Sequence, residues 1–551
     1  MNGASILARA LRQNGVETIF DIPGDPIGGV LAAARAEGMS TFSFRHEQAV
    51  TMAAQAYAFV SKRVGVGVVA SGPAMTNAIT GLTTAWANGW PLILVGGASE
   101  NGKRGLGDFQ ETPQVEAAAP FCKWSVAMDN PLRIPWFVNT AIRKALSGRP
   151  GPVYLDFPAD VINAQVDDAD VDWLQPVGEI PRAFADPEAI KRASQILAEA
   201  ERPLLLIGEG AAMSGGEAEA RDLVERLQIP FVPSPMGKGT VPDSHPLCFA
   251  GARSYALANA DVVVLAGVKF NWMFHFGREP RFADGIKVIE IGPEPEEMGA
   301  SIPPMVSLVG DYKSVLRQLA DEARPVARLE SNWVQSLEEE RQRNADAVAP
   351  MVDSEEQFTN LYRMYREINA ITLPGAIVAV DGESTMAVSR TMQNADLPAH
   401  RLDAGPSGCM GVGVPYAIGA QIAKPGTQVI CMNGDYAFGW NGMEIETACR
   451  YNLPILFVVA NNGSVRPNSP VFNMKDYTGA DAVRYDLMMQ AFGGHGELVR
   501  DVDELKPALE RALASGKTAL VNVTINPAVQ RKPQAFGWLD RLGKMQYNTA
   551  R

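Results

Sequence analysis

Two polar turns, each closing an apolar stretch, constrain the fold of this chain most. Gly434-Asp435 ends the stretch TQVICMNGD, and Asn461-Asn462 ends PILFVVANNG. The 27 residues from Asp435 to Asn462 leave room for one helix between two short strands, which predicts a βαβ unit. Parallel strands bring their carboxyl ends to one edge of a sheet. We therefore expect the Asp435 carboxylate and the Asn462 amide oxygen to lie close together.

The same alternation of apolar and helical stretches runs along the whole chain. At 551 residues the chain is too long for a single core. The pattern predicts an α/β fold with three doubly wound parallel-sheet domains and a C-terminal tail that covers something. The predicted limits are residues 1–165, 188–325 and 356–527 for the domains and 528–551 for the tail, with a linker at 166–187 and a charged helical connector at 329–346.

Composition narrows the possible partners. The net charge is −13 and no run is rich in lysine or arginine, so we expect neither nucleic acid nor a membrane as a partner.

The five cysteines form no CxxC pair and the five histidines no HxxxH pair, which predicts free thiols and no zinc site. The amino terminus lacks a signal-peptide pattern and no apolar stretch is long enough for a membrane span, so the predicted location is cytoplasmic.

The oxygen groups at the predicted sheet edge suit a hard cation. Asp435, Asn462 and a backbone carbonyl near Ser464 would supply three oxygen ligands. Mg²⁺ prefers such ligands and commonly completes its octahedron with phosphate oxygens. A diphosphate bridged by Mg²⁺ is therefore the expected ligand. The alternative for Gly434-Asp435 taken alone is a plain strand-end turn.

These residues carry a family resemblance. GDYAFG…NNG resembles the diphosphate-binding motif of thiamine diphosphate (ThDP) enzymes, and FRHEQAVTMAAQAYA (44–58) resembles the segment that holds their catalytic glutamate, here Glu47. The resemblance implies the cofactors ThDP and Mg²⁺, and a pyrimidine-binding (PYR), a central and a diphosphate-binding (PP) domain in that order. It also implies a homodimer or homotetramer with active sites at the subunit interface. The implied metal ligands are Asp435, Asn462 and Ser464, and the implied cofactor-binding residues are Glu47, Gly408, Met410, Gly434, Asp435, Tyr436, Ala437, Asn462 and Ser464.

Glu47 has a defined task in such a site. Its carboxyl must hydrogen-bond N1′ of the cofactor's aminopyrimidine, which requires an environment that raises its affinity for a proton. The alternative for Glu47 alone is a surface carboxylate. Met410 matches the bulky residue that bends the cofactor, and its alternative is a core methionine.

Longer stretches are similar to one branch of these enzymes. FQETPQVEAAAPFCKWS (109–125), GARSYAL (251–257) and INPAVQRKPQAFGWL (525–539) resemble 2-hydroxyacyl-CoA lyases and, more distantly, oxalyl-CoA decarboxylases. The prediction is a carbon–carbon lyase that cleaves a 2-hydroxyacyl-CoA to formyl-CoA and an aldehyde or ketone. The alternatives are an oxalyl-CoA decarboxylase, which expels carbon dioxide, an acetolactate-type carboligase acting on free 2-oxoacids, and a catalytically silent regulatory subunit.

The resemblance also implies substrate contacts. Phe109 stands where the decarboxylases typically carry tyrosine, which favours an apolar leaving group, although it could simply pack in the core. Gln110 and Arg466 are the other predicted catalytic residues. Arg466 replaces the usual loop tyrosine and could instead be an exposed charge. The expected CoA-binding residues are Arg253, Asn271, Arg401, Arg531, Lys532 and Trp538, with a solvated basic terminus as the alternative for the last three.

One regulatory feature of the decarboxylases is altered here. Gly292 replaces an aspartate, and Glu209 replaces a lysine, at positions where those enzymes hold an ADP effector. Both departures argue against an ADP site in this chain.

Overall fold

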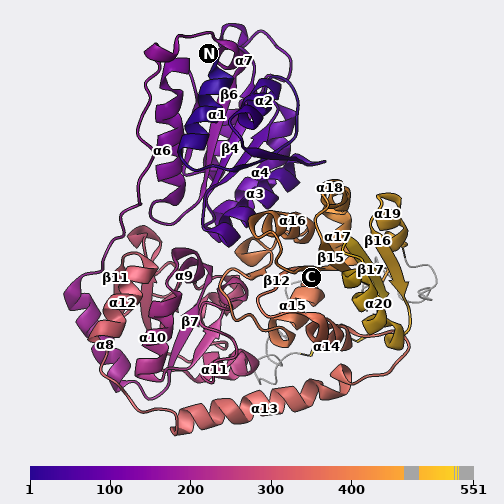
Figure 1. The fold of residues 1–551 in the computed structure, drawn as a ribbon. Coiled ribbons are helices and arrows are strands. Elements are labelled where there is room, and N and C mark those ends of the chain that lie inside the picture. The colour runs from indigo at the N-terminus through magenta and orange to yellow at the C-terminus, as the bar shows by residue number, and fades with distance from the viewer. Residues whose placement is uncertain (464–482, 527, 530, 533–551) are drawn as a thin grey trace, which may run out of the picture.

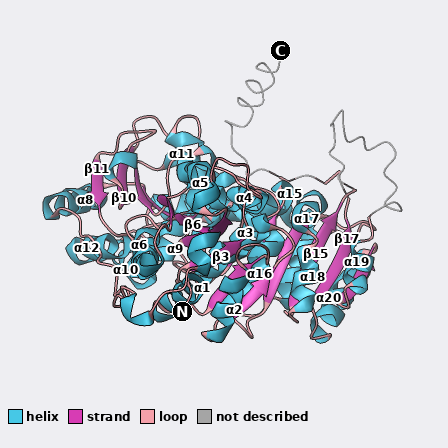
Figure 2. Cartoon of the chain, turned by 90° about the horizontal axis from the view of Figure 1, so that it is seen from above, coloured by secondary structure: helices cyan, strands magenta, loops and turns pink. Residues whose placement is uncertain are grey.

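Three parallel α/β domains form the protein (Figure 1). The computed structural model describes residues 1–463, 483–526, 528–529 and 531–532. The first domain lies above the junction of the other two, and a view from above shows it between them (Figure 2). No helix within these described ranges is both long enough and apolar enough to cross a membrane.

The first domain has a six-stranded parallel sheet in the order β2-β1-β3-β4-β6-β5. Its central strands are continuous apolar runs because helices cover both faces. The strands are β1 (Thr18–Asp21), β2 (Ser40–Ser43), β3 (Gly65–Val69), β4 (Leu92–Ala98), β5 (Trp124–Ala127) and β6 (Pro152–Pro158). The helices are α1 (Gly3–Gln13), α2 (Gly28–Ala36), α3 (Glu47–Ser61), α4 (Pro73–Asn88), α5 (Gln114–Ala118), α6 (Ile134–Leu146) and α7 (Ala159–Asn163).

The central domain has a five-stranded parallel sheet in the order β11-β10-β9-β7-β8. The strands are β7 (Pro203–Ile207), β8 (Phe231–Pro233), β9 (Val262–Ala266), β10 (Lys287–Gly292) and β11 (Val306–Val309). The helices are α8 (Pro187–Glu199), α9 (Glu209–Ser214), α10 (Glu217–Leu227), α11 (Arg253–Asn259) and α12 (Tyr312–Glu322). The connector forms α13 (Asn332–Val352), which continues six residues beyond the predicted end at 346 and runs beneath both lower domains (Figure 1).

The third domain repeats the topology of the first. Its sheet has the order β13-β12-β14-β15-β17-β16, which is the order of the first sheet when strands are renumbered from its own start. The strands are β12 (Ile377–Asp381), β13 (Arg401–Leu402), β14 (Val429–Gly434), β15 (Ile455–Asn461), β16 (His495–Val499) and β17 (Ala519–Thr524). The helices are α14 (Leu361–Ile371), α15 (Glu383–Met392), α16 (Gly413–Ala423), α17 (Asp435–Asn441), α18 (Glu444–Arg450), α19 (Tyr485–Ala491) and α20 (Val502–Ala514).

The first and third domains share one hydrophobic core. Helices α3 and α16 pack so closely that a Cβ on Gly419 would lie 2.2 Å from the Ala53 carbonyl oxygen. Beside this contact the rings of Trp90 and Tyr416 are 5.3 Å apart between centroids. The buried cluster around them contains side chains from both domains. The two domains are therefore held as one unit, and the starts of α3, α17 and α18 have fixed relative positions.

Candidate functional site

The predicted βαβ unit is present, and its two polar turns lie side by side. Strands β14 and β15 are parallel neighbours, with Gly434 opposite Ala460 in the register. Asp435 therefore begins α17 beside Asn461, and Asn462 follows one residue later. Asp435 is buried, and its Oδ1 accepts a hydrogen bond from the Tyr436 N–H at 2.8 Å.

The Asn461 side chain is used in hydrogen bonds within the third domain. Asn461 is fully buried, and its Nδ2 donates to the Val483 carbonyl at 2.9 Å and to Asn522 Oδ1 at 3.0 Å. Its Oδ1 accepts from the Gly463 N–H at 3.1 Å, which shapes the turn. Asn462, the predicted cation ligand, directly follows Asn461, and its role stays a prediction.

The donor set at this edge fits a hard cation with a phosphate ligand. Strand order reverses between β12 and β14, and such a switch point is the usual binding crevice of open α/β sheets. Gly382 follows the last residue of β12 and has φ +95°, and a Cβ there would lie 3.0 Å from the Gly434 nitrogen. Within the described ranges no cluster of three or more His, Cys, Asp or Glu side chains could hold a metal. A site with one carboxylate and one amide leaves coordination positions for phosphate oxygens.

The loop that carries Gly408 and Met410 is held from three sides. The Trp272 indole N–H donates to the Pro406 carbonyl at 2.9 Å, and Asn441 Nδ2 donates to the Gly411 carbonyl at 2.7 Å. Gly408 itself is exposed and has φ +61°, a conformation that glycine adopts without strain. Met410 is half-buried, so it is not a fully enclosed core methionine.

Asp381 is the third support of this loop. The side chain is fully buried, and its carboxylate accepts from the Gly413 N–H at 3.0 Å and from the Gly382 N–H at 2.7 Å. Burial raises the pKa of Asp381 to about 6, while the backbone N–H groups oppose that rise. Asp381 thereby joins the end of β12 to the start of α16.

Glu47 is the first residue of α3, at the face that meets the third domain. It is half-buried, and its Oε2 accepts from Asn77 Nδ2 at 3.0 Å. The preceding His46 caps the helix, because its Nδ1 accepts from the Gln48 N–H at 3.1 Å. Asn77 lies on α4 and was not predicted as a site residue. The Asn77 amide therefore fixes the Oε2 atom of the Glu47 carboxylate.

Gln110 and Phe109 lie on a loop over the first sheet. Gln110 has φ +58°, and its Oε1 accepts from Ser71 Oγ at 2.8 Å. The loop approaches Gly72 so closely that a Cβ there would lie 2.5 Å from the Gln110 carbonyl oxygen. Phe109 is 68% exposed, which excludes core packing within the chain. Buried Gln114 anchors the loop by donating to Asp156 Oδ1 at 2.6 Å.

A basic cavity of about 300 Å³ lies where the central and third domains meet. Burial lowers the pKa of Arg253, and the neighbouring Arg281, Arg390 and Arg531 lower it further. A cluster of like charges around Arg253 favours an anionic ligand. The polar and aromatic lining residues include Lys238, Arg253, Trp272, His275, Arg281, Tyr362, Arg390, Arg531 and Lys532.

The structure brings only some of the predicted CoA residues to this cavity. Arg253, Arg531 and Lys532 line it. Asn271 caps the 3₁₀ helix Trp272–Gly277, since its Oδ1 accepts from the Met273 N–H at 2.9 Å. Arg401, in β13, is 2% exposed, and its Nη2 lies 3.6 Å from Asp403 Oδ2. It does not line the basic cavity. Ser464, Arg466 and Trp538 lie outside the described residues.

Glu209 and Gly292, which stand at the altered effector positions, have defined surroundings in the central domain. Glu209 begins α9, and its Oε2 accepts from Ser234 Oγ at 3.1 Å. Gly292 ends β10, where a Cβ would lie 3.3 Å from Met298 Cε.

Arg281 and Arg390 also went unpredicted. They come from segments far apart in the chain and follow no recognisable spacing. The only signal in the sequence is their residue type, because both are long cations.

Comparison with known proteins agrees with this architecture. Three family models match in order: the thiamine pyrophosphate enzyme N-terminal TPP binding domain at residues 1–118, the central domain at 190–319 and the C-terminal TPP binding domain at 381–523. Human 2-hydroxyacyl-CoA lyase 1 is 38% identical, over 98% of this chain and 97% of the relative. Oxalyl-CoA decarboxylase of Escherichia coli is 36% identical, over 96% and 95%. A probable acetolactate synthase of Mycobacterium bovis is 31% identical, over 96% of both chains.

The predicted fold class is thus confirmed, whereas the exact domain limits stay predictions. Full-length similarity to enzymes indicates that the chain is an enzyme that uses thiamine diphosphate. The chain belongs to the thiamine pyrophosphate enzymes, in the family of 2-hydroxyacyl-CoA lyases and oxalyl-CoA decarboxylases.

Proposed function

We propose that this chain is a Mg²⁺-dependent carbon–carbon lyase that cleaves a 2-hydroxyacyl-CoA to formyl-CoA and an aldehyde or ketone. The basic cavity carries the proposal that the substrate is a CoA thioester. It gathers Arg253, Arg281, Arg390 and Arg531 at one junction, and guanidinium groups bind phosphates through paired hydrogen bonds. A free 2-oxoacid would not need such a cluster.

Phe109 supports an apolar leaving group. Its ring is largely exposed beside Gln110, on the same domain as Glu47. A carboxylate buried against this ring without a donor would cost several kcal/mol, whereas an alkyl or aryl group gains about 25 cal/mol for each Å² buried. The balance favours the lyase over the decarboxylase.

The cofactor would be held by the carboxyl edge of the third sheet. Asp435 and Asn462 would coordinate Mg²⁺, with a backbone carbonyl near Ser464 as the third protein ligand. The loop with Gly408 and Met410 would support the aminopyrimidine and thiazolium rings. Bound thiamine diphosphate supplies the nucleophilic carbon and the electron sink of the reaction.

Residues of the chain would hold the proton at N1′ of the aminopyrimidine and orient the groups around it. Glu47 would hold a proton at N1′ of the aminopyrimidine, and Asn77 would keep its carboxylate turned toward that atom. The Gly408 carbonyl would accept from the 4′-amino group. Gln110, fixed by Ser71, would present its amide beside the reacting carbon.

We also propose a homodimer or homotetramer. Tyr436, Trp440 and Met443 lie on or just after α17 and are 47%, 56% and 53% exposed. Large apolar side chains next to a cofactor edge are typical of a surface that a second subunit covers. The cytoplasmic location stays a prediction.

The experiment is a substrate panel with the purified chain, thiamine diphosphate and Mg²⁺. Several 2-hydroxyacyl-CoA esters and oxalyl-CoA are compared by kcat/KM, with formyl-CoA and the carbonyl product measured. We expect apolar 2-hydroxyacyl-CoA esters to react best. A higher kcat/KM for oxalyl-CoA would show a decarboxylase, and condensation of free 2-oxoacids without thioester cleavage would show a carboligase.

A further inference from the structure

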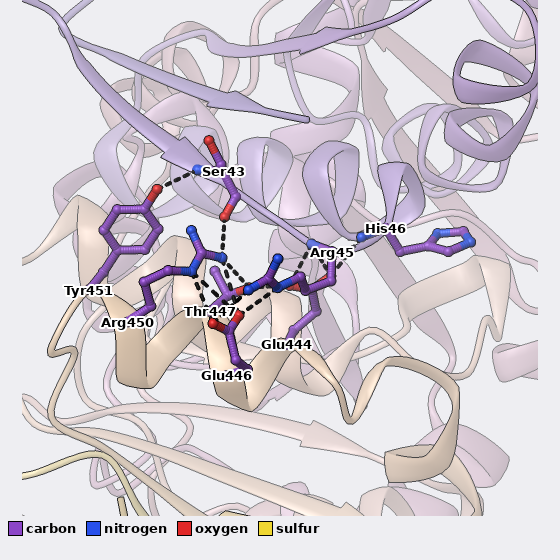
Figure 3. A network of polar contacts seen from close by, with 8 residues as sticks. All are labelled: Ser43, Arg45, His46, Glu444, Glu446, Thr447, Arg450 and Tyr451. Carbon is purple, nitrogen blue, oxygen red and sulfur yellow. Dashed lines mark hydrogen bonds and ion pairs between the residues drawn. The ribbon is translucent and has the colours of Figure 1, made fainter. Parts of the chain in front are cut away.

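The segment that leads into Glu47 is held by a helix of another domain. Residues 43–46 run from the last residue of β2 to the residue before α3 in the first domain, and α18 of the third domain lies against them (Figure 3). The Tyr451 hydroxyl accepts from the Ser43 N–H at 2.7 Å, and Arg450 Nη2 donates to the Ser43 carbonyl at 2.7 Å. Both polar groups of the Ser43 backbone thus have partners about 400 residues away in the sequence.

Glu444 makes the contacts nearest to Glu47. Its Oε1 accepts from the Arg45 N–H and from the His46 N–H, each at 3.0 Å. Its Oε2 accepts from the Thr447 hydroxyl at 2.6 Å, which fixes the side chain one helical turn along α18. The Glu444 side chain is 1% exposed. A buried carboxylate that accepts two consecutive backbone N–H groups fixes that stretch of main chain.

The main chain fixed by Glu444 sets the position of Glu47. His46 is the residue that caps α3, and Glu47 is the next residue. The direction in which α3 begins therefore determines where the Glu47 carboxyl lies. Displacements of about 1 Å at a reacting group can lower a rate about a hundredfold.

Resting on the proposed function, we propose that Glu444 is a positioning residue for the proton transfer at Glu47, acting through the backbone N–H groups of Arg45 and His46. It holds the segment that precedes Glu47 against α18 of the same chain. Asp435 and Glu444 stand at the starts of the consecutive helices α17 and α18. Because the expected active sites lie at the subunit interface, the Asp435 of this chain and the Glu47 segment that α18 holds would serve different active sites.

Glu446 provides a matched comparison on the same helix. It also contacts this segment, but only through side chains: its Oε2 lies 2.7 Å from Arg45 Nε, and its Oε1 accepts from Arg450 Nε at 3.1 Å. The Arg45 side chain is 51% exposed, so this ion pair lies at the surface of the chain. Glu446 touches none of the main-chain N–H groups that Glu444 holds. The two acids therefore separate a main-chain role from a surface charge.

The test uses three variants of the full-length protein. Glu444→Met removes every acceptor at nearly constant volume, while Glu444→Gln keeps one oxygen for the two N–H groups. Glu446→Met is the control. Hydrogen exchange of the amides at 45 and 46 is measured in the cofactor-free protein by mass spectrometry, followed by kcat and KM for an apolar 2-hydroxyacyl-CoA. Thermal denaturation checks that each variant is folded.

We expect Glu444→Met to increase exchange at 45 and 46 at least tenfold. It should lower kcat at least about tenfold, with KM for the thioester changed less than about twofold. Glu444→Gln should restore most of both properties, and Glu446→Met should change neither. Unchanged exchange in Glu444→Met, or a kcat no lower than that of Glu446→Met, overturns the proposal. If no thioester reacts, the proposed function fails, while the exchange result still shows whether Glu444 holds the segment.

Discussion

Phe109 offers the sharpest test of the leaving-group pocket. A phenylalanine can bury about 200 Å², so 68% exposure leaves roughly 140 Å² accessible. If an apolar leaving group covers half of that area, burial contributes about 1.8 kcal/mol at 25 cal/mol per Å², or roughly 20-fold in kcat/KM. We therefore expect Phe109→Ala to lower kcat/KM for an apolar 2-hydroxyacyl-CoA by about 20-fold, and for oxalyl-CoA by much less.

The control for this experiment is Phe184→Ala. Phe184 is 67% exposed but lies in the segment between the first and central domains, so its loss should affect neither substrate. Initial rates of formyl-CoA formation with both thioesters give the ratio. An equal loss for both substrates would mean that Phe109 supports the loop and does not select the leaving group. No loss for either would remove Phe109 from the pocket altogether.

Three further substitutions separate the parts of the site. Glu47→Gln should lower kcat by about two orders of magnitude or more while calorimetry shows thiamine diphosphate binding retained, and near-normal turnover would remove Glu47 from the proton relay. Asp435→Ala should weaken cofactor and Mg²⁺ binding severely in the same titration, and unchanged affinity would place the metal elsewhere. Arg253→Gln should raise KM for the thioester about tenfold with little change in kcat, and an unchanged KM would move the CoA phosphates to another surface.

The sequence alone predicted the fold class well because its signals are local. Buried parallel strands read as continuous apolar runs, and the polar turns at 435 and 462 mark strand ends. Arg401 shows the limit of such patterns. This basic residue is expected to contact CoA, and that role stays a prediction; the structure places its side chain in the interior beside Asp403. The direction of a side chain at a strand edge depends on packing that no local pattern reveals.

Contacts between segments far apart in the chain also could not be predicted from the sequence. Glu444 and Glu446 are two residues apart and look alike in the sequence, yet only Glu444 is enclosed against the first domain. Asn77, Arg281 and Arg390 likewise acquire their roles from neighbours far away in the chain. The residues that position catalytic groups are therefore harder to predict than the groups themselves.

Glu444 and Glu446 should also affect stability with opposite dependence on pH. Burial raises the pKa of Glu444 to about 7, against the lowering effect of Thr447, of the Arg45 and His46 N–H groups and of Arg450. Hydrogen bonding to Arg45 instead lowers the pKa of Glu446 to about 2, although partial burial opposes it and Arg450 adds to it. The folded chain therefore binds a proton at Glu444 that the unfolded chain has released between about pH 4.5 and 7.

The free energy of unfolding should consequently fall across that window as pH rises, by about 3 kcal/mol from Glu444 alone, because each pKa unit corresponds to about 1.4 kcal/mol. Relative to the wild type, Glu444→Gln should gain stability between pH 5 and pH 8. Glu446→Gln should lose stability near pH 7 and approach the wild type as pH falls toward 2, since a lowered pKa stabilises the fold only above the unfolded value. Urea denaturation at several pH values gives both curves. A Glu444→Gln curve parallel to that of the wild type would show that the folded protein does not retain this proton, so the carboxylate would be charged when it holds the backbone ahead of Glu47.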